Sequence, residues 1–233
     1  MTVAAIMQPY FFPYIGYWQM ISAADTFVIY DDVNYIKGGW INRNNLLLKH
    51  EPHLFTLSLD QASPFKKIND ITIQAASGNR AKILAIVSSA YKKAPHYKRV
   101  FPFLESVILN QEPNLALFLH KQICDVCHFL GIQTKIILSS NLAKNNDLRG
   151  QDKVIEICKN LKAHTYINAI GGTKLYSKAD FQAQEINLNF ILSQPVPYAQ
   201  IDAPFVPWLS IIDVMMFNDR QDITRLLKAY VLT

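Results

Sequence analysis

The first 32 residues constrain the fold of this chain more than any other segment. Val3 to Met7 is a short apolar run that ends at Gln8-Pro9, which is typical of a buried strand. Residues 14–23 carry apolar side chains at helical spacing, and Thr26 to Tyr30 is a second apolar run, ended by two aspartates. Strand, loop, helix and strand in this order predict a βαβ unit, whose strands are parallel and whose crossover is right-handed.

The same alternation of strands and helices returns later in the chain. A hairpin is predicted over 46–59, strands at 71–73, 135–138, 165–168 and 188–192, and helices at 151–161, 209–217 and 222–230. About residues 79–131 form a helical stretch that prolines divide into three helices. We therefore predict one α/β domain over residues 1–233, built on a doubly wound parallel sheet with a helical insertion at about 79–131 and C-terminal helices.

Composition and charge narrow the functional classes. Half of the residues are hydrophobic and 18% are charged, which fits a compact core and argues against disorder or a coiled coil. The net charge of +5 suits anionic small molecules such as nucleotides or nucleotide sugars. Lysine and arginine are scattered without a basic run, so nucleic-acid binding is the weaker interpretation. Without a basic leader or a long apolar run, we expect a cytoplasmic protein with no membrane insertion.

One cysteine motif is a candidate haem site. Residues 124–128 read Cys-Asp-Val-Cys-His, the attachment sequence of c-type haem. The motif lies inside a predicted helix whose apolar residues recur at helical spacing, and no export signal precedes it. We predict that these cysteines are small core residues and that they form no zinc site.

The loop after the first strand has an uncommon composition. Residues 8–17 read Gln-Pro-Tyr-Phe-Phe-Pro-Tyr-Ile-Gly-Tyr and lead into a predicted helix, whose N-terminal amides suit a phosphate. The tyrosines could stack on a base or donate to an anion, and the glycine would let a ligand approach the backbone. The alternative is that these aromatic residues pack into the core. The ligand-binding candidates of this loop are Gln8, Tyr10, Tyr14, Gly16 and Tyr17.

The loop after the second strand, residues 31–44, combines two acids with two cations. Asp31 and Asp32 at the end of a strand can hold Mg²⁺ or a ribose. Lys37 and Arg43 can hold phosphates or a carboxylate, and the glycines between them allow close approach. A solvated turn is the alternative, although a turn rarely contains a tryptophan, an arginine and two acids together. Further ligand-binding candidates here are Trp40, Asn42 and Asn44.

Later loops offer weaker candidates. Asp152 stands at a predicted helix start, where it is either part of an anion site or an ordinary first-turn acid. Asn168, Gly171 and Gly172 follow a predicted strand, and the double glycine serves either a ligand or only a turn. Asp213, on an apolar helix, is either a buried functional carboxylate or a surface residue.

These loops resemble those of one protein family. Residues 6–17 resemble the opening signature of the WbqC-like family, and residues 25–33 with 37–44 resemble its second block. Residues 150–152, 166–176 and 209–214 are similar to its later blocks, so the resemblance covers almost the whole chain. It implies a protein of O-antigen and other polysaccharide clusters, for whose members transfer of glycine to an amino sugar is one suggested activity.

A second resemblance is more distant. The first strand, Gln-Pro, and Tyr14 to Tyr17 opening a helix are similar to the nucleotidylyltransferase and pantothenate-synthetase superfamily, whose loop reads His-x-Gly-His and binds ATP phosphates. This resemblance implies a nucleotidylyltransferase-like Rossmann variant. Both histidines are tyrosines here, and tyrosine donates a hydrogen bond but carries no positive charge. Either Lys37 and Arg43 supply that charge, or nucleotide transfer has been lost.

The hypothesis that follows is an enzyme of surface-polysaccharide synthesis that joins glycine to a nucleotide-linked amino sugar through an amide, as an acyltransferase or an ATP-dependent ligase. Its catalytic candidates are Lys37, Arg43 and Asp32, in a positively biased cavity shared by the first two loops. Replacing Lys37 or Arg43 by alanine would then abolish turnover without unfolding the protein.

Its substrates would be a nucleotide sugar and an amino acid, and ATP with Mg²⁺ would be the cofactor of an acyl-adenylate route. The alternatives are a non-catalytic module that binds a sugar nucleotide or nucleic acid, and a nucleotidylyltransferase. The sequence leaves the acceptor sugar, the acyl donor and the oligomeric state open.

Overall fold

The computed structural model describes residues 1–74, 78–201 and 204–233. Within these ranges, six strands form the central sheet in the order β10-β9-β8-β1-β2-β7. They are β1 (Val3–Met7), β2 (Thr26–Ile29), β7 (Lys135–Leu138), β8 (Thr165–Ala169), β9 (Asn187–Ser193) and β10 (Tyr230–Leu232). Neighbouring strands are parallel except β9 and β10, which are antiparallel. The predicted α/β class with a mostly parallel sheet is confirmed.

The strand order is that of doubly wound sheets. Counted along the chain, the strands from β7 to β10 across the sheet are the third, second, first, fourth, fifth and sixth, which is the Rossmann-type order. The direction of winding reverses between β1 and β8, because the chain continues from β1 to β2 on one side and from β8 to β9 on the other.

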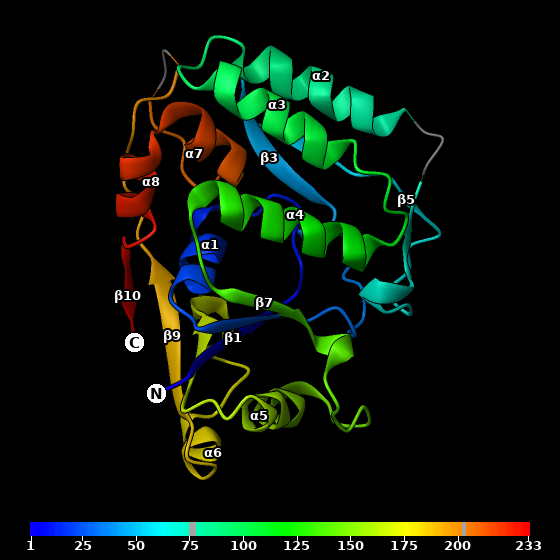
Figure 1. Ribbon diagram of the computed structural model, residues 1–233, viewed down its shortest axis with the longest axis vertical. Helices are drawn as coiled ribbons and strands as arrows, with labels where there is room; N and C mark the ends of the chain where they lie inside the picture. The colour runs from blue at the N-terminus through cyan, green and yellow to red at the C-terminus, as the bar shows by residue number, and fades with distance from the viewer. Residues whose placement is uncertain (75–77, 202–203) are drawn as a thin grey trace.

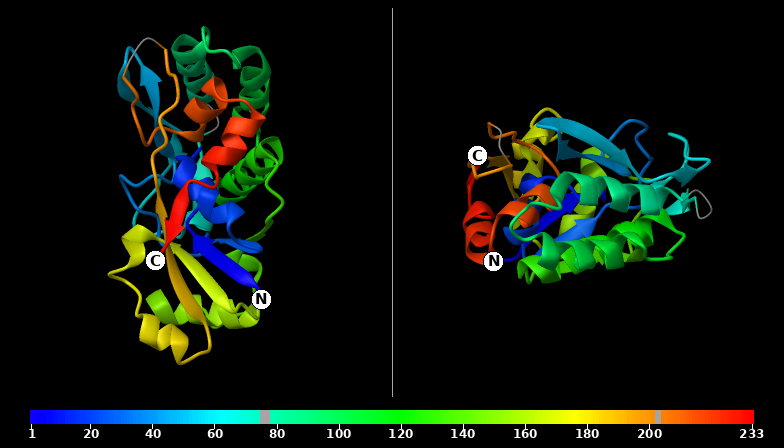
Figure 2. Two further views of the ribbon diagram at one scale, coloured as in Figure 1. Left: turned by 90° about the vertical axis from the view of Figure 1, so that its left-hand side faces the viewer. Right: turned by 90° about the horizontal axis from the view of Figure 1, so that it is seen from above.

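Helices cover both faces of this sheet (Figures 1 and 2). Helices α1 (Ile15–Ser22), α4 (Leu115–Leu130) and α8 (Arg220–Leu226) lie on one face, and α5 (Gly150–Asn160) and α6 (Lys178–Gln182) lie on the other. The alternation of side chains along β1 explains the two layers. Ala5 belongs to the core under the first group of helices, whereas Ala4 and Ile6 belong to the core under the second.

Between β2 and β7 the chain adds two hairpins and a series of helices. Strand β3 (Arg43–Leu48) pairs with β4 (Glu51–Thr56), and β5 (Leu59–Asp60) pairs with β6 (Thr72–Ile73), with the 3₁₀ turn η1 (Ile68–Asp70) between them. Helices α2 (Asn79–Tyr91), α3 (Tyr97–Ile108) and α4 follow. In Figure 1, α2 and α3 lie at the opposite end of the molecule from α5 and α6. The helix α7 (Ile211–Phe217) precedes α8.

Helix α4 illustrates how local sequence sets an element. The side chain of Asn114 accepts the amide of Leu117 and caps its start, and Gly131 ends it with a φ of 78°. The Cys-Asp-Val-Cys-His motif lies in this helix with Cys127 buried and Cys124 half-buried, both as free thiols.

No helix in the described part of the chain is long and apolar enough to cross a membrane.

The C-terminal helix is shorter than the sequence predicted. Helix α8 ends at Leu226, and Tyr230–Leu232 pair with β9 as strand β10, so the prediction of helix up to residue 230 was wrong there. The three residues of β10 have no periodicity of their own. They are extended because β9, about forty residues earlier in the chain, supplies their hydrogen bonds.

Candidate functional site

A pocket of about 400 Å³ lies where the winding of the sheet reverses. It is lined by residues that follow the carboxyl ends of β1 and β8, by the last residues of β9, and by parts of two further loops. We call it the switch-point pocket; its lining residues are Tyr10, Pro13, Tyr14, Trp40, Asn44, Ile170, Ile191, Leu192, Ser193 and Trp208. Doubly wound sheets bind their ligands at this position, in the crevice outside the carboxyl ends of the strands.

The aromatic loop after β1 serves both the core and the pocket. Phe11, Phe12 and Tyr17 are buried, and the Tyr17 hydroxyl donates to the carbonyl of Gln8 at 2.9 Å. Tyr10 and Tyr14, by contrast, line the pocket. The core interpretation of this loop is therefore correct for Phe11, Phe12 and Tyr17, whereas Tyr10 and Tyr14 stay candidates for ligand binding.

A strained residue fixes the path of this loop. Phe12 has a φ of 43°, in the left-handed region that phenylalanine rarely adopts. Its N–H donates to Gln122 Oε1 at 2.9 Å, and its carbonyl accepts from Asn44 Nδ2 at 2.8 Å and from Ser210 Oγ at 2.7 Å. These three contacts, from distant parts of the chain, hold the turn that presents Tyr10 and Tyr14. Asn44 thus positions the loop as well as lining the pocket.

Gly16 determines where the Tyr14 ring lies. A Cβ atom at Gly16 would be 2.4 Å from Cε2 of Tyr14, so the ring lies where any other side chain would begin. The ring also contacts Trp208 edge to face, with centroids 5.8 Å apart. The Tyr14 ring therefore occupies the space at Gly16 through which the sequence suggested that a ligand could approach the backbone.

Three hydroxyl groups of the lining residues have no hydrogen-bond partner in the part of the chain that the structure describes. Neither Tyr10 nor Tyr14 has a hydrogen-bond partner for its hydroxyl within the described ranges, and the buried Ser193 Oγ also has none. Burial, and then the neighbouring Tyr14, raises the pKa of Tyr10, and burial raises the pKa of Tyr14. Both tyrosines are therefore protonated hydrogen-bond donors at neutral pH.

The second loop meets the first at this pocket, but its cations point elsewhere. Arg43 Nε donates to the Gly39 carbonyl at 3.0 Å, a terminal nitrogen of Arg43 donates to the Gly38 carbonyl, and the guanidinium lies 5.9 Å from the centre of the Trp40 ring. Lys37 is exposed at the turn. No described residue that lines the pocket is charged, so the expected positive bias is absent from its wall.

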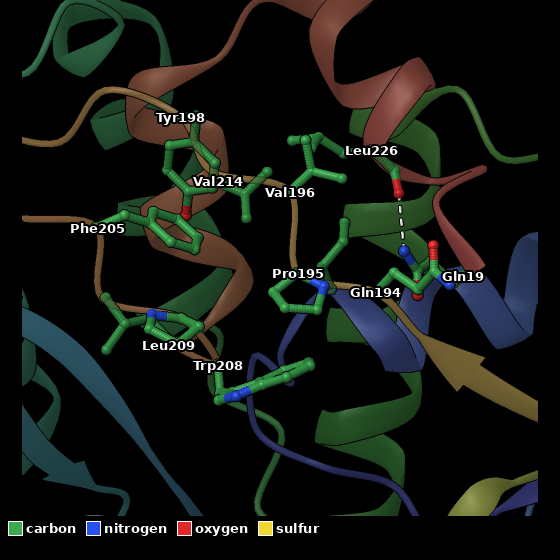
Figure 3. A pocket seen from close by; sticks show the side chains of 12 residues that line it. Gln19, Gln194, Pro195, Val196, Tyr198, Phe205, Trp208, Leu209, Val214 and Leu226 are labelled. Atoms are coloured by element: carbon green, nitrogen blue, oxygen red, sulfur yellow. Dashed lines mark hydrogen bonds between the residues drawn. The ribbon is translucent and has the colours of Figure 1, made fainter. Parts of the chain in front are cut away.

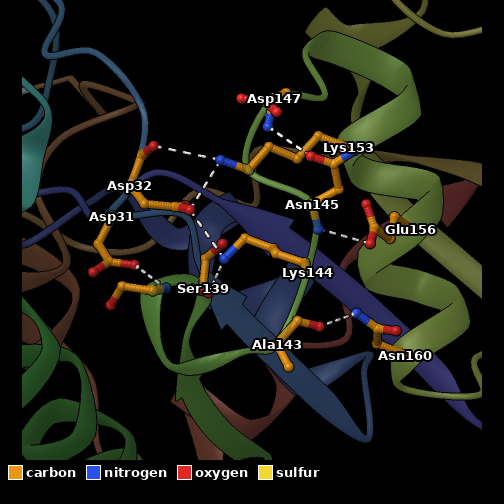
Figure 4. A network of polar contacts seen from close by, with 11 residues as sticks. Asp31, Asp32, Ser139, Ala143, Lys144, Asn145, Asp147, Lys153, Glu156 and Asn160 are labelled. Atoms are coloured by element: carbon orange, nitrogen blue, oxygen red, sulfur yellow. Dashed lines mark hydrogen bonds and ion pairs between the residues drawn. The ribbon is translucent and has the colours of Figure 1, made fainter.

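Asp32 forms a buried ion-pair cluster at the carboxyl ends of β2 and β7 (Figure 4). Its Oδ2 lies 3.0 Å from Lys144 Nζ and 2.9 Å from Lys153 Nζ, and all three side chains are at most 6% exposed. Burial acts to raise the pKa of Asp32, but the contacts with Lys153 and Lys144 outweigh it, so this pKa is below its ordinary value. The neighbouring Asp31 is also buried, and its Oδ1 accepts the amide of Ser140 at 3.0 Å.

The remaining candidates lie outside the pocket wall. Asn42 is buried; its side chain accepts a hydrogen bond from the Tyr35 hydroxyl and donates one to the Leu57 carbonyl. The side-chain oxygen of Asn168 accepts the backbone N–H of the next residue, and its amide nitrogen fills the space at Gly172. Asp152 is an exposed first-turn residue of α5. Gly171 borders the pocket residue Ile170 in the 3₁₀ turn η4 (Ile170–Gly172).

Trp208 is an aromatic pocket residue that the sequence did not reveal. It belongs to the segment between β9 and α7, which has neither strand nor helix periodicity, and its φ of 64° is rare for tryptophan. Figure 3 shows side chains of this segment, Pro195, Tyr198, Phe205 and Trp208, around a second cavity of about 30 Å³, room for about one water molecule. No local sequence pattern predicts that this irregular segment lines a cavity.

Asp213 in α7 attaches this segment to the core. The carboxylate is fully buried and accepts three hydrogen bonds: from Tyr198 at 2.6 Å, from Gln200 at 2.7 Å and from Tyr91 at 2.9 Å. Burial raises its pKa, and the hydrogen bonds oppose that rise only in part. Of the two alternatives from the sequence, the surface position is wrong, because Asp213 is buried. Its carboxylate holds the segment between β9 and α7, which carries Trp208, through the hydrogen bonds from Tyr198 and Gln200.

The fold and the pocket define a doubly wound α/β protein with an aromatic pocket at its switch point. The chain belongs to the WbqC-like protein family, whose model matches residues 8–225, as the resemblance suggested. It is similar to the uncharacterized protein Rv1507c of Mycobacterium tuberculosis (strain ATCC 25618 / H37Rv), with 26% identity over 221 residues that cover 94% of each chain. No solved structure matches the chain.

Proposed function

We propose that the protein binds a nucleotide-linked amino sugar in the switch-point pocket and modifies it during the synthesis of a bacterial surface polysaccharide. One observation carries the proposal. The pocket lies where doubly wound sheets bind ligands, and four aromatic side chains wall it: Tyr10, Tyr14, Trp40 and Trp208. Membership of the WbqC-like family supports the link to polysaccharides.

The chemistry of the wall suits a ligand that presents the face of a ring. Sugar rings and nucleobases both stack on tryptophan and tyrosine, and both present groups that hydroxyls can bind. Small-molecule sites have volumes of roughly 300–1,000 Å³, and a pocket of about 400 Å³ is near the lower end. We therefore place one ring and its substituents inside, with the phosphates of the ligand at the mouth.

The proposed reaction joins the amine of the sugar to an activated glycine. The amine nitrogen attacks the glycine carbonyl carbon and forms a C–N bond, the activating group leaves with its electron pair, and the nitrogen loses one proton to water. The tetrahedral intermediate carries a negative oxygen, which positioned hydroxyl donors stabilise. The protonated hydroxyls of Tyr10 and Tyr14 are suited to this role because neither has another partner among the described residues.

ATP is the activating reagent that we propose, through an acyl-phosphate or acyl-adenylate of glycine. As they lie, Asp31 and Asp32 fit Mg²⁺ poorly, because the Asp32 carboxylate is paired with two ammonium groups. The described residues also contain no group of three His, Cys, Asp or Glu side chains that could hold a metal ion. We therefore assign no step to a protein-bound metal.

Binding by the pocket predicts a specific effect at Gly16. In Gly16→Ala the new methyl group displaces the Tyr14 ring, because no space exists between them. We expect the dissociation constant for UDP-glucosamine to rise about tenfold, from the loss of one aromatic contact. Isothermal titration calorimetry measures it.

Gly171→Ala is the matched control. It borders the pocket residue Ile170, but a Cβ atom there meets nothing within 4 Å. This variant should bind UDP-glucosamine like the wild type. Equal affinity of Gly16→Ala and Gly171→Ala, with Tyr14 displaced only in the former, would remove Tyr14 from the binding site.

A non-catalytic binding module is the second candidate. One observation favours it: the described lining residues include no carboxylate, imidazole or amine that could act as a base. Pyrophosphate or phosphate release from ATP that requires both glycine and an amino sugar supports the enzyme. Binding of the nucleotide sugar with no release under the same conditions supports the module. A nucleotidylyltransferase would instead form a nucleotide sugar from a sugar phosphate.

A further inference from the structure

Two turns next to the pocket form one exposed tip. An antiparallel bridge joins Asn34 to Lys67, and the Tyr35 N–H donates to the Lys66 carbonyl at 2.9 Å. Residue 36 follows this pair and residue 65 precedes it, so both lie at the same end of the bridge, where the two turns begin. We call residues 36–39 and 63–66 the tip.

Hydrogen bonds define both turns of the tip. The Gly39 N–H donates to the Ile36 carbonyl at 3.1 Å, and Gly38 between them has a φ of 79°. The Lys66 N–H donates to the Ser63 carbonyl at 3.0 Å. The tip is therefore built of two hydrogen-bonded turns that define the path of its backbone.

The tip exposes large apolar side chains. Phe65 is 92% exposed and Ile36 is 52% exposed. Phe65 gains almost nothing from burial at such exposure, and Ile36 leaves about half of its surface in water. Apolar groups gathered at one exposed site mark a surface that another body covers. Trp40, 45% exposed, follows the first turn directly and lines the switch-point pocket, so the tip and the pocket mouth are continuous.

The charged side chains of the two segments that form the tip have one sign. Lys37, Lys66, Lys67 and Arg43 lie in residues 33–43 and 61–67, and these two segments contain no carboxylate. The nearest exposed acids in the chain are Asp60 and Asp70, outside both segments. Exposed apolar side chains surrounded by cations match the interface of an anionic bilayer, where apolar groups enter the acyl boundary and cations meet the headgroups.

We propose that the tip docks on an anionic phospholipid surface, with Phe65 and Ile36 in the headgroup layer and the lysines against the phosphates. The binding is peripheral, and it depends on no assumption about what the pocket holds. A nucleic acid would be expected to use several stacking rings in a basic groove, whereas the tip pairs one ring with an aliphatic side chain. Docking would bring the pocket mouth, through Trp40, close to substrates carried by the membrane.

Co-sedimentation of the full chain with vesicles tests this. We expect binding to mixed phosphatidylglycerol and phosphatidylcholine vesicles, weakened by salt, and little binding to pure phosphatidylcholine. Phe65→Ser should lower the partition coefficient about tenfold, and the double variant Lys66→Gln with Lys67→Gln should lower it about tenfold or more.

Leu232→Ser is the matched control. Leu232 is 45% exposed on β10, which is the edge strand farthest from β2 and β7. The tip follows β2 in the chain, so the replacement of Leu232 should leave vesicle binding unchanged. The proposal is overturned if the wild type does not bind the anionic vesicles, if Phe65→Ser binds them as well as the wild type does, or if Leu232→Ser loses as much binding as Phe65→Ser. Salt-sensitive binding of RNA without vesicle binding would assign the tip to nucleic acid instead.

Discussion

Asp32→Ala should lower the free energy of unfolding by about 3–5 kcal/mol, since removing one partner of a buried ion pair leaves an uncompensated charge. Two lysines depend on this carboxylate, and the side chains of Lys144 and Lys153 are only 1% and 6% exposed. The variant leaves both ammonium groups without their carboxylate in the space between β2, β7 and α5 (Figure 4). Urea denaturation at neutral pH measures the loss.

A surface pair provides the control for this prediction. Lys121 and Asp125 lie 2.9 Å apart, the same distance as Lys153 and Asp32, but their side chains are 55% and 30% exposed. Water screens such pairs, so Asp125→Ala should cost no more than about 0.5 kcal/mol. Equal losses in the two variants would show that burial does not decide the effect.

The same contacts set a pH dependence. Because the pKa of Asp32 is lower in the folded chain than its ordinary value of 3.8, this group stabilises the fold above that pH. The contribution disappears as pH falls through the lower, folded-state pKa. The difference in stability between wild type and Asp32→Ala should therefore be constant near neutrality and shrink in acid.

Asp213→Ala should cost about 3 kcal/mol or more, because it removes a buried acceptor from three hydrogen bonds and leaves the hydroxyls of Tyr91 and Tyr198 without an acceptor. The hydroxyls of Tyr91 and Tyr198 and the amide of Gln200 all donate to this carboxylate. Two of these donors, Tyr198 and Gln200, belong to the segment that carries Trp208. Loss of the Asp213 carboxylate should therefore also weaken ligand binding in the switch-point pocket. Thermal unfolding and titration calorimetry on the same sample measure both effects.

Asp213→Asn isolates the effect of charge at this position. Burial raises the folded-state pKa of Asp213 above its ordinary value of 3.8, so the folded chain binds this proton more tightly than the unfolded chain does. Its contribution is fully present below that value and is lost as pH rises through the folded-state pKa. The stability of the wild type relative to Asp213→Asn should thus decrease as pH rises from about 4; a constant difference would contradict the raised pKa.

The sequence singled out two loops that the fold brings together at the pocket, but it did not separate the lining residues from the core. The first two loops meet at the pocket because strands β1 and β2 are parallel neighbours, which the βαβ pattern predicts. Whether Tyr10 and Tyr14 or Phe11 and Phe12 face outward depends on the left-handed turn at Phe12. That turn is fixed by Asn44, Gln122 and Ser210, which no local pattern connects to it.

Long-range contacts explain the other differences. Asp32 looked like a ligand of Mg²⁺ or a ribose because its partners are far along the chain. Lys153 is 121 residues away and occupies the first turn of a helix, where lysine is usually solvated. Arg43 looked like a phosphate ligand, but the two glycines that seemed to admit a ligand offer their own carbonyls to it. In both cases the residue type indicated a charged side chain, and only the fold showed which groups of the protein bind it.

A crystal structure of the protein with UDP-glucosamine tests the central claim most directly. We expect one ring of the ligand in the switch-point pocket, against Tyr14 and Trp208, with its polar groups within hydrogen-bonding distance of the hydroxyls of Tyr10 or Ser193. A ligand bound elsewhere, for example beside Lys92 and Lys93 at the end of α2, with the switch-point pocket filled only by water, would contradict the account.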